Sequence, residues 1–440
     1  MRLFICQRCI SLMQPILRQH QQMICWLSVK TVSQLSCPKE TGKERRSCYK
    51  IHTLSSGRNM SAKEISNDIN LEFLQKKVGC VDSIYVWGNG GTGALGRYPL
   101  NVSLGYGFTV FWSRTQNRSS VYGCGLNTSR QLGIQSNPDD PDHFPDFIME
   151  PALININLNN EQSGRQSQVV DISCGKAHTW IVTDDNKVFS FGSNAYGQCG
   201  KPANGHNISR CNKSFLFHEK IKQVCCGLDH TLVLTTDGNV YSCGLGADGQ
   251  TGLGHYKAVD TLTLVCGDIK EKGDVFGWGN SEYGQFSAAI GDEMQVNTPR
   301  HLPFLQEKTI RQAAAAGTMC GLLDDEGKVY IWGYGALGRH HIIEQTNVPQ
   351  LVDRCSFGAK QMMEDFHVTQ LSCGLTHFAA VTELGELYMW GKQRMHCLGS
   401  CQSKDDADIL YTPTKVDVPA HVISTSCGID HSCAVCVTRN

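Results

Sequence analysis

The chain has 440 residues, which suits one large domain or two ordinary ones. Its net charge is −1, and no run approaches the 18 or so apolar residues of a membrane-spanning helix, so the composition predicts a soluble, globular body. The small net charge conceals an asymmetry: residues 1–60 carry ten basic and two acidic side chains, whereas the rest carries 30 basic and 39 acidic ones.

The first part of the chain has the composition of a targeting segment. No acidic residue precedes Glu40, and basic residues are scattered among Leu, Ile, Ser and Gln. Few acids together with Arg and Ser are typical of organellar transit peptides, and the apolar runs are too short for a secretory signal. We therefore expect a disordered mitochondrial transit peptide and linker at 1–61 and a lead-in segment at 62–82. A disordered tail without a targeting role is the alternative.

The 22 cysteines predict neither disulfides nor a metal site. Disulfide-rich domains are small and secreted, whereas this chain is large and has no secretory signal. Cys433 and Cys436 are three positions apart in a stretch that has the pattern of a strand, so their side chains should point to opposite faces. Cys6 and Cys9 have the same spacing but lie in the expected transit peptide, and no His-x₃₋₅-His pair accompanies either pair. We expect buried free thiols, no structural metal and no cofactor.

A repeated unit covers the rest of the chain. The segments 174–200, 226–252, 316–338 and 373–399 share one frame. Each begins with an apolar alternating run, followed by a polar turn and a second alternating run. The second run ends in an aromatic residue or Cys followed by Gly. Two such runs across a short turn predict a β-hairpin. A glycine-rich loop and a longer connection follow, with room for two more strands.

The position before the recurring glycine identifies seven units. It is occupied by Trp87, Cys124, Phe191, Cys243, Trp278, Trp332 and Trp390. The underlying period is about 52 residues, and four short strands in such a repeat are typical of a β-propeller blade. We therefore predict an all-β fold, a seven-bladed β-propeller at residues 83–440.

The two ends of this region complement each other. Ser83–Gly88 supplies the second half of a hairpin without the first, and SCGIDHSCAVCV at 426–437 supplies the first half without the second. We expect the two terminal strands to pair in one blade, which would close the ring and remove exposed sheet edges.

One glycine-rich stretch, CGLGADGQTGLGHY at 243–256, contains the G-x-G-x-x-G fingerprint of dinucleotide-binding turns. That fingerprint is informative only where it opens a helix, and the glycines that follow it here would destabilise one. We instead expect the repeated glycines to permit positive φ and close approach between neighbouring blades. The repeat positions are Gly88, Gly125, Gly192, Gly244, Gly279, Gly333 and Gly391.

These motifs, CGxxHT followed by VFxFG or VYxWG and a G-x-LG turn, resemble the repeats of the regulator of chromosome condensation superfamily over residues 80–440. GLGADGQTGLGHY, GWGNSEYGQ and CGLTHFAAVTELGELYMWGK are similar to its mitochondrial exchanging-factor-like branch. The resemblance implies guanine-nucleotide exchange on the mitochondrial dynamin-like fusion GTPase. It also implies association with a pseudouridine-synthase module that supports mitochondrial large-subunit ribosomal RNA and ribosome assembly.

Two units are shorter than the others. Seven residues separate Gly96 from the degenerate LGYGFT at 104–109, and CGDIKEKGDVFGWG at 266–279 lacks the His-Thr strand. Each unit is about 15 residues short, enough for two strands. We expect truncated, irregular blades near 97–108 and 255–275, either as a property of the fold or because the sequence lacks pieces of the natural transcript.

The recurring histidines predict a structural role rather than catalysis. His178, His230, His377 and His431 hold one equivalent position, whereas an acid–base or metal site needs different residues that converge. We expect half-buried imidazoles that satisfy backbone groups of the neighbouring strand. The sequence has no G-x-S-x-G, P-loop or H-E-x-x-H motif, so we predict that the protein is not an enzyme.

Nucleotide exchange needs no catalytic set, because an exchange factor works by binding the empty GTPase better than the loaded one. Asp248, in the most elaborate glycine loop, is an acidic candidate for that contact. A turn-forming aspartate is the alternative, and the more frequent case. The Asn-, Asp- and Pro-rich insertion at 134–168 is either a functional loop or a solvated excursion.

Basic residues after the glycine turns define a second candidate surface. If equivalent loops share one rim, they form a collar of the kind that binds phosphates. The candidates are Arg339, His340, Lys392 and Arg394. The acidic body and the lack of stacking aromatic residues among them favour scattered solvated charges, with any RNA contact made through protein partners.

The sequence as a whole therefore predicts a regulatory propeller of the mitochondrial matrix, with peripheral association with the inner membrane as an option. Its leading function is exchange on the mitochondrial dynamin-like GTPase. The alternatives are a scaffold for ribosomal-RNA modification and a nuclear, chromatin-bound relative.

Overall fold

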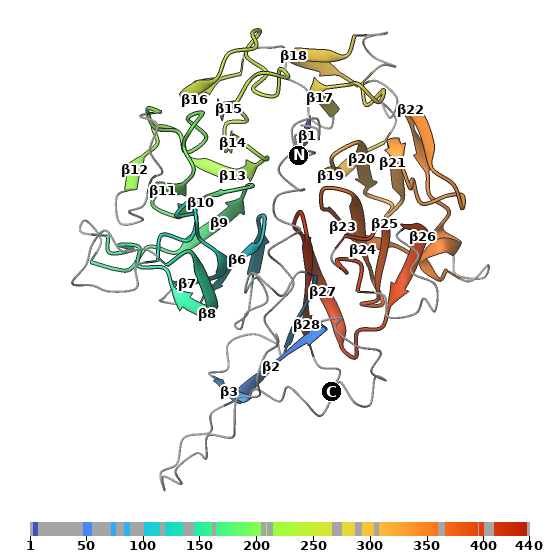
Figure 1. The fold of residues 1–440 in the computed structure, drawn as a ribbon, viewed down its shortest axis with the longest axis horizontal. Coiled ribbons are helices and arrows are strands. Elements are labelled where there is room, and N and C mark those ends of the chain that lie inside the picture. The colour runs from blue at the N-terminus through green and yellow to red at the C-terminus, as the bar shows by residue number, and fades with distance from the viewer. Residues whose placement is uncertain are drawn as a thin grey trace, which may run out of the picture.

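The fold consists of strands arranged around one axis (Figure 1). In the part of the chain that is described, the only helix is a short 3₁₀ helix, η3 (Arg354–Phe357), and no helix is long and apolar enough to cross a membrane. The computed structural model describes residues 3–7, 47–54, 72–75, 83–88, 101–114, 119–134, 145–160, 164–203, 208, 214–265, 275–286, 293–302, 308–359, 366–394, 396–399 and 409–437.

Five of the seven sheets are four-stranded and antiparallel, and they confirm the predicted propeller architecture. The first two comprise β5 (Asn101–Leu104), β6 (Phe108–Arg114), β7 (Ser119–Leu126) and β8 (Phe147–Leu153), then β9 (Val169–Cys174), β10 (His178–Thr183), β11 (Lys187–Gly192) and β12 (Ser214–Leu216). The third comprises β13 (Ile221–Cys226), β14 (His230–Thr235), β15 (Val240–Gly244) and β16 (Val259–Leu264). The last two comprise β19 (Ile310–Ala315), β20 (Met319–Asp324), β21 (Val329–Gly335) and β22 (Glu344–Leu351), then β23 (Val368–Cys373), β24 (His377–Thr382), β25 (Leu387–Lys392) and β26 (Ile409–Val416).

The core lies between adjacent sheets. The second strand of a blade is buried along its whole length, as in β10, β14 and β24, and its β-branched and aromatic side chains suit a strand covered on both faces. The aromatic position before the recurring glycine is fully buried at Phe191, Trp278, Trp332 and Trp390. Each sheet therefore packs through its large apolar side chains against the next.

The sixth sheet joins the two ends of the propeller region. It contains β27 (His421–Cys427), β28 (His431–Val437), β4 (Ser83–Gly88), β2 (Ser47–Leu54) and β3 (Glu72–Gln75). β28 and β4 are antiparallel, with His431 opposite Gly88, so the predicted pairing of the terminal strands is present. On the other side of β4, β2 pairs in parallel, from Lys50 opposite Ser83 to Leu54 opposite Trp87.

The seventh sheet has three strands, β1 (Leu3–Gln7), β17 (Val275–Asn280) and β18 (Gln295–His301). β17 and β18 are antiparallel, whereas β1 is parallel to β17. The predicted shortage around 255–275 falls on this sheet and not on the one before it, because β16 completes its own four-stranded sheet. Residues 266–274 lie outside the described residues.

Two expectations about the N-terminal half are wrong. The degenerate LGYGFT unit belongs to the inner strands β5 and β6 of a complete blade, and the Gly105 N–H donates to Phe108 O at 3.0 Å to close the turn between them. The expected truncation is therefore absent at 101–108. Residues 97–100 lie outside the described residues. Residues 1–61 were expected to be disordered, yet β1 and β2 of that segment pair with β17 and β4, and β3 of the lead-in segment pairs with β2. The rest of 1–82 lies outside the described residues.

Candidate partner-binding face

The loops that follow the recurring glycines share one end of the ring. In the third sheet His230 is opposite Gly244, so the turn before β14 and the loop after β15 lie at the same end, and β10 and β24 have the same register with their neighbours. We call this end the glycine-turn face. Its segments are 126–134, 193–203, 245–258, 280–286, 334–343, 392–394 and 396–399.

The glycines of this face provide backbone conformations and space that other residues lack. The predicted positive φ is present at Gly125, Gly192, Gly244, Gly279, Gly333 and Gly391, with values from 101° to 119°. A Cβ atom at Gly244 would lie 2.5 Å from Asp229 O, and one at Gly246 would lie 2.2 Å from Lys257 O. The glycine-rich stretch at 243–256 is therefore packed against its own sheet and its neighbours, as the repeat interpretation predicted.

One turn is built in the same way in four of these segments. A glutamine side-chain oxygen accepts a hydrogen bond from the backbone N–H two residues before it, at 2.8–3.0 Å. The donor residues are Ser129, Tyr196, Asp248 and Tyr283. The backbone of the glutamine also receives a hydrogen bond from the next sheet, as from Trp278 Nε1 to Gln250 O at 3.0 Å. The glutamine therefore holds the turn, and the side chain of the donor residue is left to vary.

This arrangement changes how Asp248 is interpreted. Its turn contact uses the backbone N–H, which Ser129 and Tyr196 provide equally well, so the turn does not require a carboxylate. The half-buried side chain accepts a hydrogen bond from Gln295 Nε2 of β18 at 3.3 Å. Asp248 thus places an acidic group on the glycine-turn face at the boundary between two sheets.

The predicted basic collar is only partly available for a ligand. Arg339 forms an ion pair with Glu344 and its side chain is 17% exposed, whereas His340 is 67% exposed with its Nε2 3.5 Å from the same carboxylate. Lys392 at the end of β25 is exposed. Arg394 is half-buried, and its backbone N–H donates to Cys397 Sγ at 3.5 Å. The four residues lie in two successive loops of this face, but Arg339 already has a carboxylate partner.

Sequence analysis missed a row of exposed aromatic side chains on the same face. Tyr196, Tyr256 and Tyr334 are 40%, 47% and 41% exposed, and they come from three different sheets. Tyr283 stacks on Tyr334 across a sheet boundary, with ring centroids 5.2 Å apart and an interplanar angle of 19°. The sequence interpretation considered aromatics only among the basic residues and did not anticipate these tyrosines. Aligning the repeats would have revealed part of the row, because Tyr196 and Tyr283 share the turn position of Asp248.

The repeat histidines are buried links between sheets. Their side chains are 0–3% exposed rather than half-buried, and three of them share a hydrogen bond with a side-chain hydroxyl of the next sheet, a partner that sequence analysis did not predict. The pairs are His178 Nε2 with Thr231 Oγ1 at 3.0 Å, His377 Nε2 with Ser432 Oγ at 3.0 Å and His431 Nε2 with Thr109 Oγ1 at 2.9 Å. Burial lowers the pKa of His178 to about 3 and that of His377 to about 4, so these imidazoles are neutral.

The axis of the ring contains thiols that are poor nucleophiles. A cavity of about 140 Å³ is lined by cysteines from four sheets: Cys174, Cys226, Cys373 and Cys427. Burial raises the pKa of Cys174 and of Cys427 to about 12, far from the thiolate form that attacks or binds metal. Among the described residues no cluster of three His, Cys, Asp or Glu side chains could hold a metal ion.

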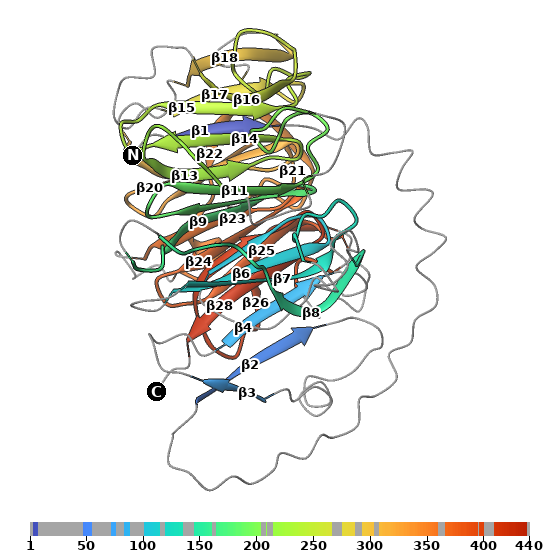
Figure 2. The same cartoon turned by 90° about the vertical axis from the view of Figure 1, so that its left-hand side faces the viewer.

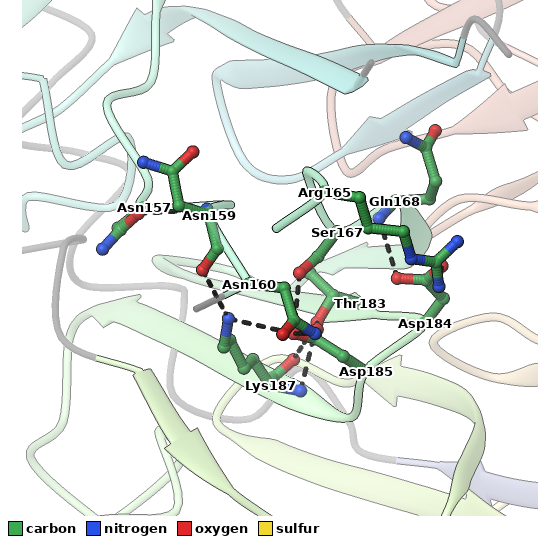
Figure 3. A network of polar contacts seen from close by, with 10 residues as sticks. All are labelled: Asn157, Asn159, Asn160, Arg165, Ser167, Gln168, Thr183, Asp184, Asp185 and Lys187. Carbon is green, nitrogen blue, oxygen red and sulfur yellow. Dashed lines mark hydrogen bonds and ion pairs between the residues drawn. The ribbon is translucent and has the colours of Figure 1, made fainter. Parts of the chain in front are cut away.

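The opposite end of the ring anchors the C-terminal part of the long insertion (Figure 3). Asp185 accepts hydrogen bonds from Thr183 Oγ1 at 2.5 Å, Ser167 Oγ at 2.7 Å and Asn160 Nδ2 at 3.0 Å, and it forms an ion pair with Lys187 at 2.9 Å. Partial burial opposes the charge, but these hydrogen bonds and the Lys187 ammonium outweigh it and lower the pKa of Asp185 to about 2. Residues 135–144 of the insertion lie outside the described residues.

Comparison with known proteins identifies the repeat. The regulator of chromosome condensation (RCC1) repeat matches residues 119–182, 185–234, 272–323, 326–381 and 385–435, which together make up more than half of the chain. A second description of the same repeat matches 169–198, 221–250 and 368–397.

Individual relatives match over most of their length. The RCC1-like G exchanging factor-like proteins of Mus musculus and Homo sapiens are each 35% identical to this chain over 86% of it, and the matches cover 94% and 93% of those proteins. The crystal structure of human WBSCR16 has a TM-score of 0.72 at 34% identity, covering 81% of this chain and 99% of that one. Prp20p from Saccharomyces cerevisiae, whose structure was described together with its binding to Gsp1p and histones, has a TM-score of 0.62 at 17% identity over 83% of this chain and 93% of its own; it shows the fold alone.

Proposed function

This chain belongs to the family of proteins built from the regulator of chromosome condensation repeat, and from that premise we propose that it is a non-catalytic guanine-nucleotide exchange factor whose glycine-turn face binds a GTPase. The observation that carries the proposal is the match to two proteins named as G exchanging factor-like over nearly their whole length. The proposed ring has seven units: five four-stranded blades and two sheets that N-terminal strands complete.

The position of Asp248 supports this use of the face. An exchange factor must bind the nucleotide-free GTPase more tightly than the loaded one. The nucleotide pocket of a GTPase is lined by groups that hold phosphates and Mg²⁺, including a lysine. A carboxylate at the tip of a rigid turn offers that pocket an anionic group once the nucleotide leaves. Asp248 is such a carboxylate, and its turn is fixed by Gln250.

The tyrosines on either side of Asp248 supply contact area. Protein interfaces depend on a few large anchors, with Tyr among the most frequent. Tyr196 lies one sheet before Asp248, and the Tyr283–Tyr334 stack lies in the two sheets after it. An acidic group between aromatic anchors suits a GTPase surface better than it suits RNA.

The identity and place of the partner follow from the N-terminal composition and the family resemblance. We propose the mitochondrial dynamin-like fusion GTPase as the partner, because the resemblance to the exchanging-factor-like branch implies it. We propose a place in the matrix and at the inner membrane because the first 60 residues carry ten basic and two acidic side chains.

The test is release of a fluorescent guanine nucleotide from that GTPase with and without the full chain. We expect accelerated release by the wild-type chain and loss of most of the acceleration in Asp248→Ala. The matched control is Asp237→Ala, an exposed turn residue of the same sheet at its opposite end, which should leave release unchanged. Acceleration that survives Asp248→Ala would remove this residue from the proposal, and no acceleration by a folded chain would refute exchange.

The ribosomal-RNA scaffold is the second candidate, and Lys392 is the residue that favours it. This side chain is exposed on the glycine-turn face, whereas Arg339 is engaged by Glu344. A scaffold that contacts RNA should lose ribosomal-RNA association in Lys392→Gln with Arg394→Gln. Exchange on the GTPase should be unaffected by these changes, which separates the two functions.

A further inference from the structure

The two sheets that depart from the four-stranded pattern share an unusual feature. Each is extended by a parallel strand from the N-terminal segment, β1 beside β17 and β2 beside β4. In the other five sheets every ladder is antiparallel and sequential. These are also the two sheets affected by the short intervals in the sequence. The N-terminal strands therefore lie at positions of these two sheets that no described strand of the repeat region occupies.

β1 occupies the inner position that a missing second strand would hold. In complete blades a residue of the second strand faces the aromatic or Cys position of the third strand. Examples are Thr179, which is opposite Phe191, and Phe378, which is opposite Trp390. In the three-stranded sheet Cys6 holds the position opposite Trp278, although β1 is parallel to β17 and a second strand of the repeat is antiparallel to its neighbour. β1 also lies against β19 of the following sheet, so it is enclosed on the axis side of β17 (Figures 1 and 2).

The edge of β17 needs such a partner. All six residues of β17 are buried, and Val275, Phe276 and Trp278 belong to an apolar cluster that reaches into the sheets on both sides. Backbone N–H and C=O groups in that setting cannot be satisfied by bulk water, and leaving them unpaired is costly. The β1 segment, LFICQ, is a short run of mostly apolar residues that suits a buried strand position.

We propose that the axis-side edge of β17 is a strand-acceptor site for an extended apolar peptide, and that Leu3–Gln7 of the same chain is its resident ligand. The binding mode is β-strand addition, in which main-chain hydrogen bonds supply the affinity. The proposal goes beyond nucleotide exchange and does not depend on it. It has a consequence for processing, because cleavage after residue 61 would remove β1 and vacate the site.

The first test weakens the resident strand in the full chain. Ile5→Pro removes a ladder donor from the middle of β1, and Gln21→Pro in the same segment is the matched control. We expect the thermal midpoint of Ile5→Pro to fall by about 5 °C relative to Gln21→Pro. A synthetic peptide with the sequence MRLFICQRCI should restore it in a saturable way, and the same peptide with Pro at its fifth position should not. Equal midpoints for the two variants, or no rescue of a folded Ile5→Pro chain, would overturn the proposal.

The second test does not require a destabilised variant. Phe4 is opposite Phe276 in the ladder, so a photoreactive benzoylphenylalanine at position 4 keeps an aromatic residue there. We expect cross-links in the full chain to peptides that contain residues 275–280 or 310–315, identified by mass spectrometry. Cross-links confined to other parts of the chain would show that Leu3–Gln7 does not fill the site, whatever the outcome for the exchange activity.

Discussion

The junction that closes the ring and the junction that precedes β17 are held by different interactions. At the closing junction a polar chain crosses from one sheet to the next: Asp430 Oδ1 lies 2.9 Å from His431 Nδ1, and His431 Nε2 lies 2.9 Å from Thr109 Oγ1. Before β17 the corresponding strand position is Cys6, which has no hydroxyl. Apolar packing and the Trp278 hydrogen bond to Gln250 O hold that junction.

This difference shows which parts of the repeat carry specificity. Three His–hydroxyl links, from His178, His377 and His431, fix a sheet to its neighbour through hydrogen-bond direction as well as through buried area. Before β17, a strand donated by the N-terminal segment provides the backbone pairing on the inner side of the sheet. The ring therefore tolerates irregular units on the side of β17, while the closing junction depends on particular residues.

The strongest way to break the comparison is His431→Ala. It leaves the buried Asp430 carboxylate without its imidazole partner, although the Gly107 N–H still donates to it at 3.1 Å, and it removes a hydrogen-bond partner of Thr109. We expect a loss of about 3–5 kcal/mol in the free energy of unfolding, measured by urea denaturation. His178→Ala should cost less, because Thr231 Oγ1 keeps its hydrogen bond to Gln198 O at 2.9 Å. Equal losses would contradict the special role of the closing junction.

The glycines give a second contrast of smaller size. Gly244→Ala combines a φ of 106° with a contact 2.5 Å from Asp229 O, and should cost about 3 kcal/mol. Gly254→Ala has a φ of 80° and its nearest neighbour 3.8 Å away, so only the conformational cost of about 1 kcal/mol applies. Urea midpoints of the two variants test this order. Indistinguishable variants would show that close approach does not matter in the Gly244 turn.

The buried imidazoles predict acid sensitivity. The folded pKa values of His178 and His377 are about 3 and 4, below the unfolded value of about 6.5, so the unfolded chain takes up protons first as the pH falls. Their contribution should be complete above about pH 6.5 and decline to about pH 4 for His377 and about pH 3 for His178, with a loss at pH 5 of about 2 kcal/mol for each imidazole. Urea titrations at several pH values measure this slope. His341→Gln, at an exposed position, should leave the slope unchanged, and a flat profile between pH 6.5 and 5 would contradict buried neutral histidines.

The smallest expected effect is at the opposite end of the ring. Asp185 has a pKa of about 2 in the fold against about 3.9 when unfolded, so its contribution is present above pH 4 and is lost as the pH falls towards 2. Asp185→Asn should lower the free energy of unfolding by about 1–2 kcal/mol at pH 7 and by about a third of that at pH 2.5. A pH-independent difference would mean that the carboxylate charge has no part in anchoring residues 160–168.

Sequence patterns predicted the features that depend on residues within one repeat unit and on the two ends of the repeat region. The hairpins, the positive φ of glycines such as Gly192 and the pairing of 83–88 with the last strand all follow from repeated segments and from the complementary ends. The turn around Asp248 was recognised as glycine-driven, but its shared glutamine bond was not.

What the sequence could not predict depends on contacts between sheets. Thr231 and Ser432 became histidine partners only because adjacent sheets bring them within 3.0 Å. The Tyr283–Tyr334 stack joins two units whose loops differ in length, so alignment within one unit does not reveal it. The degenerate unit at 104–109 was expected to form a truncated blade, yet Phe108 occupies the histidine position, is fully buried and packs against Gly105.

The central claim is tested most directly by the affinity of the full chain for two states of the mitochondrial dynamin-like GTPase. An exchange factor must bind the nucleotide-free state more tightly, because only differential affinity displaces the nucleotide. We predict about tenfold or greater preference for the nucleotide-free form over the GDP-loaded form in calorimetry, reduced towards unity in Asp248→Ala. Equal affinity for both forms would contradict an exchange function for the glycine-turn face.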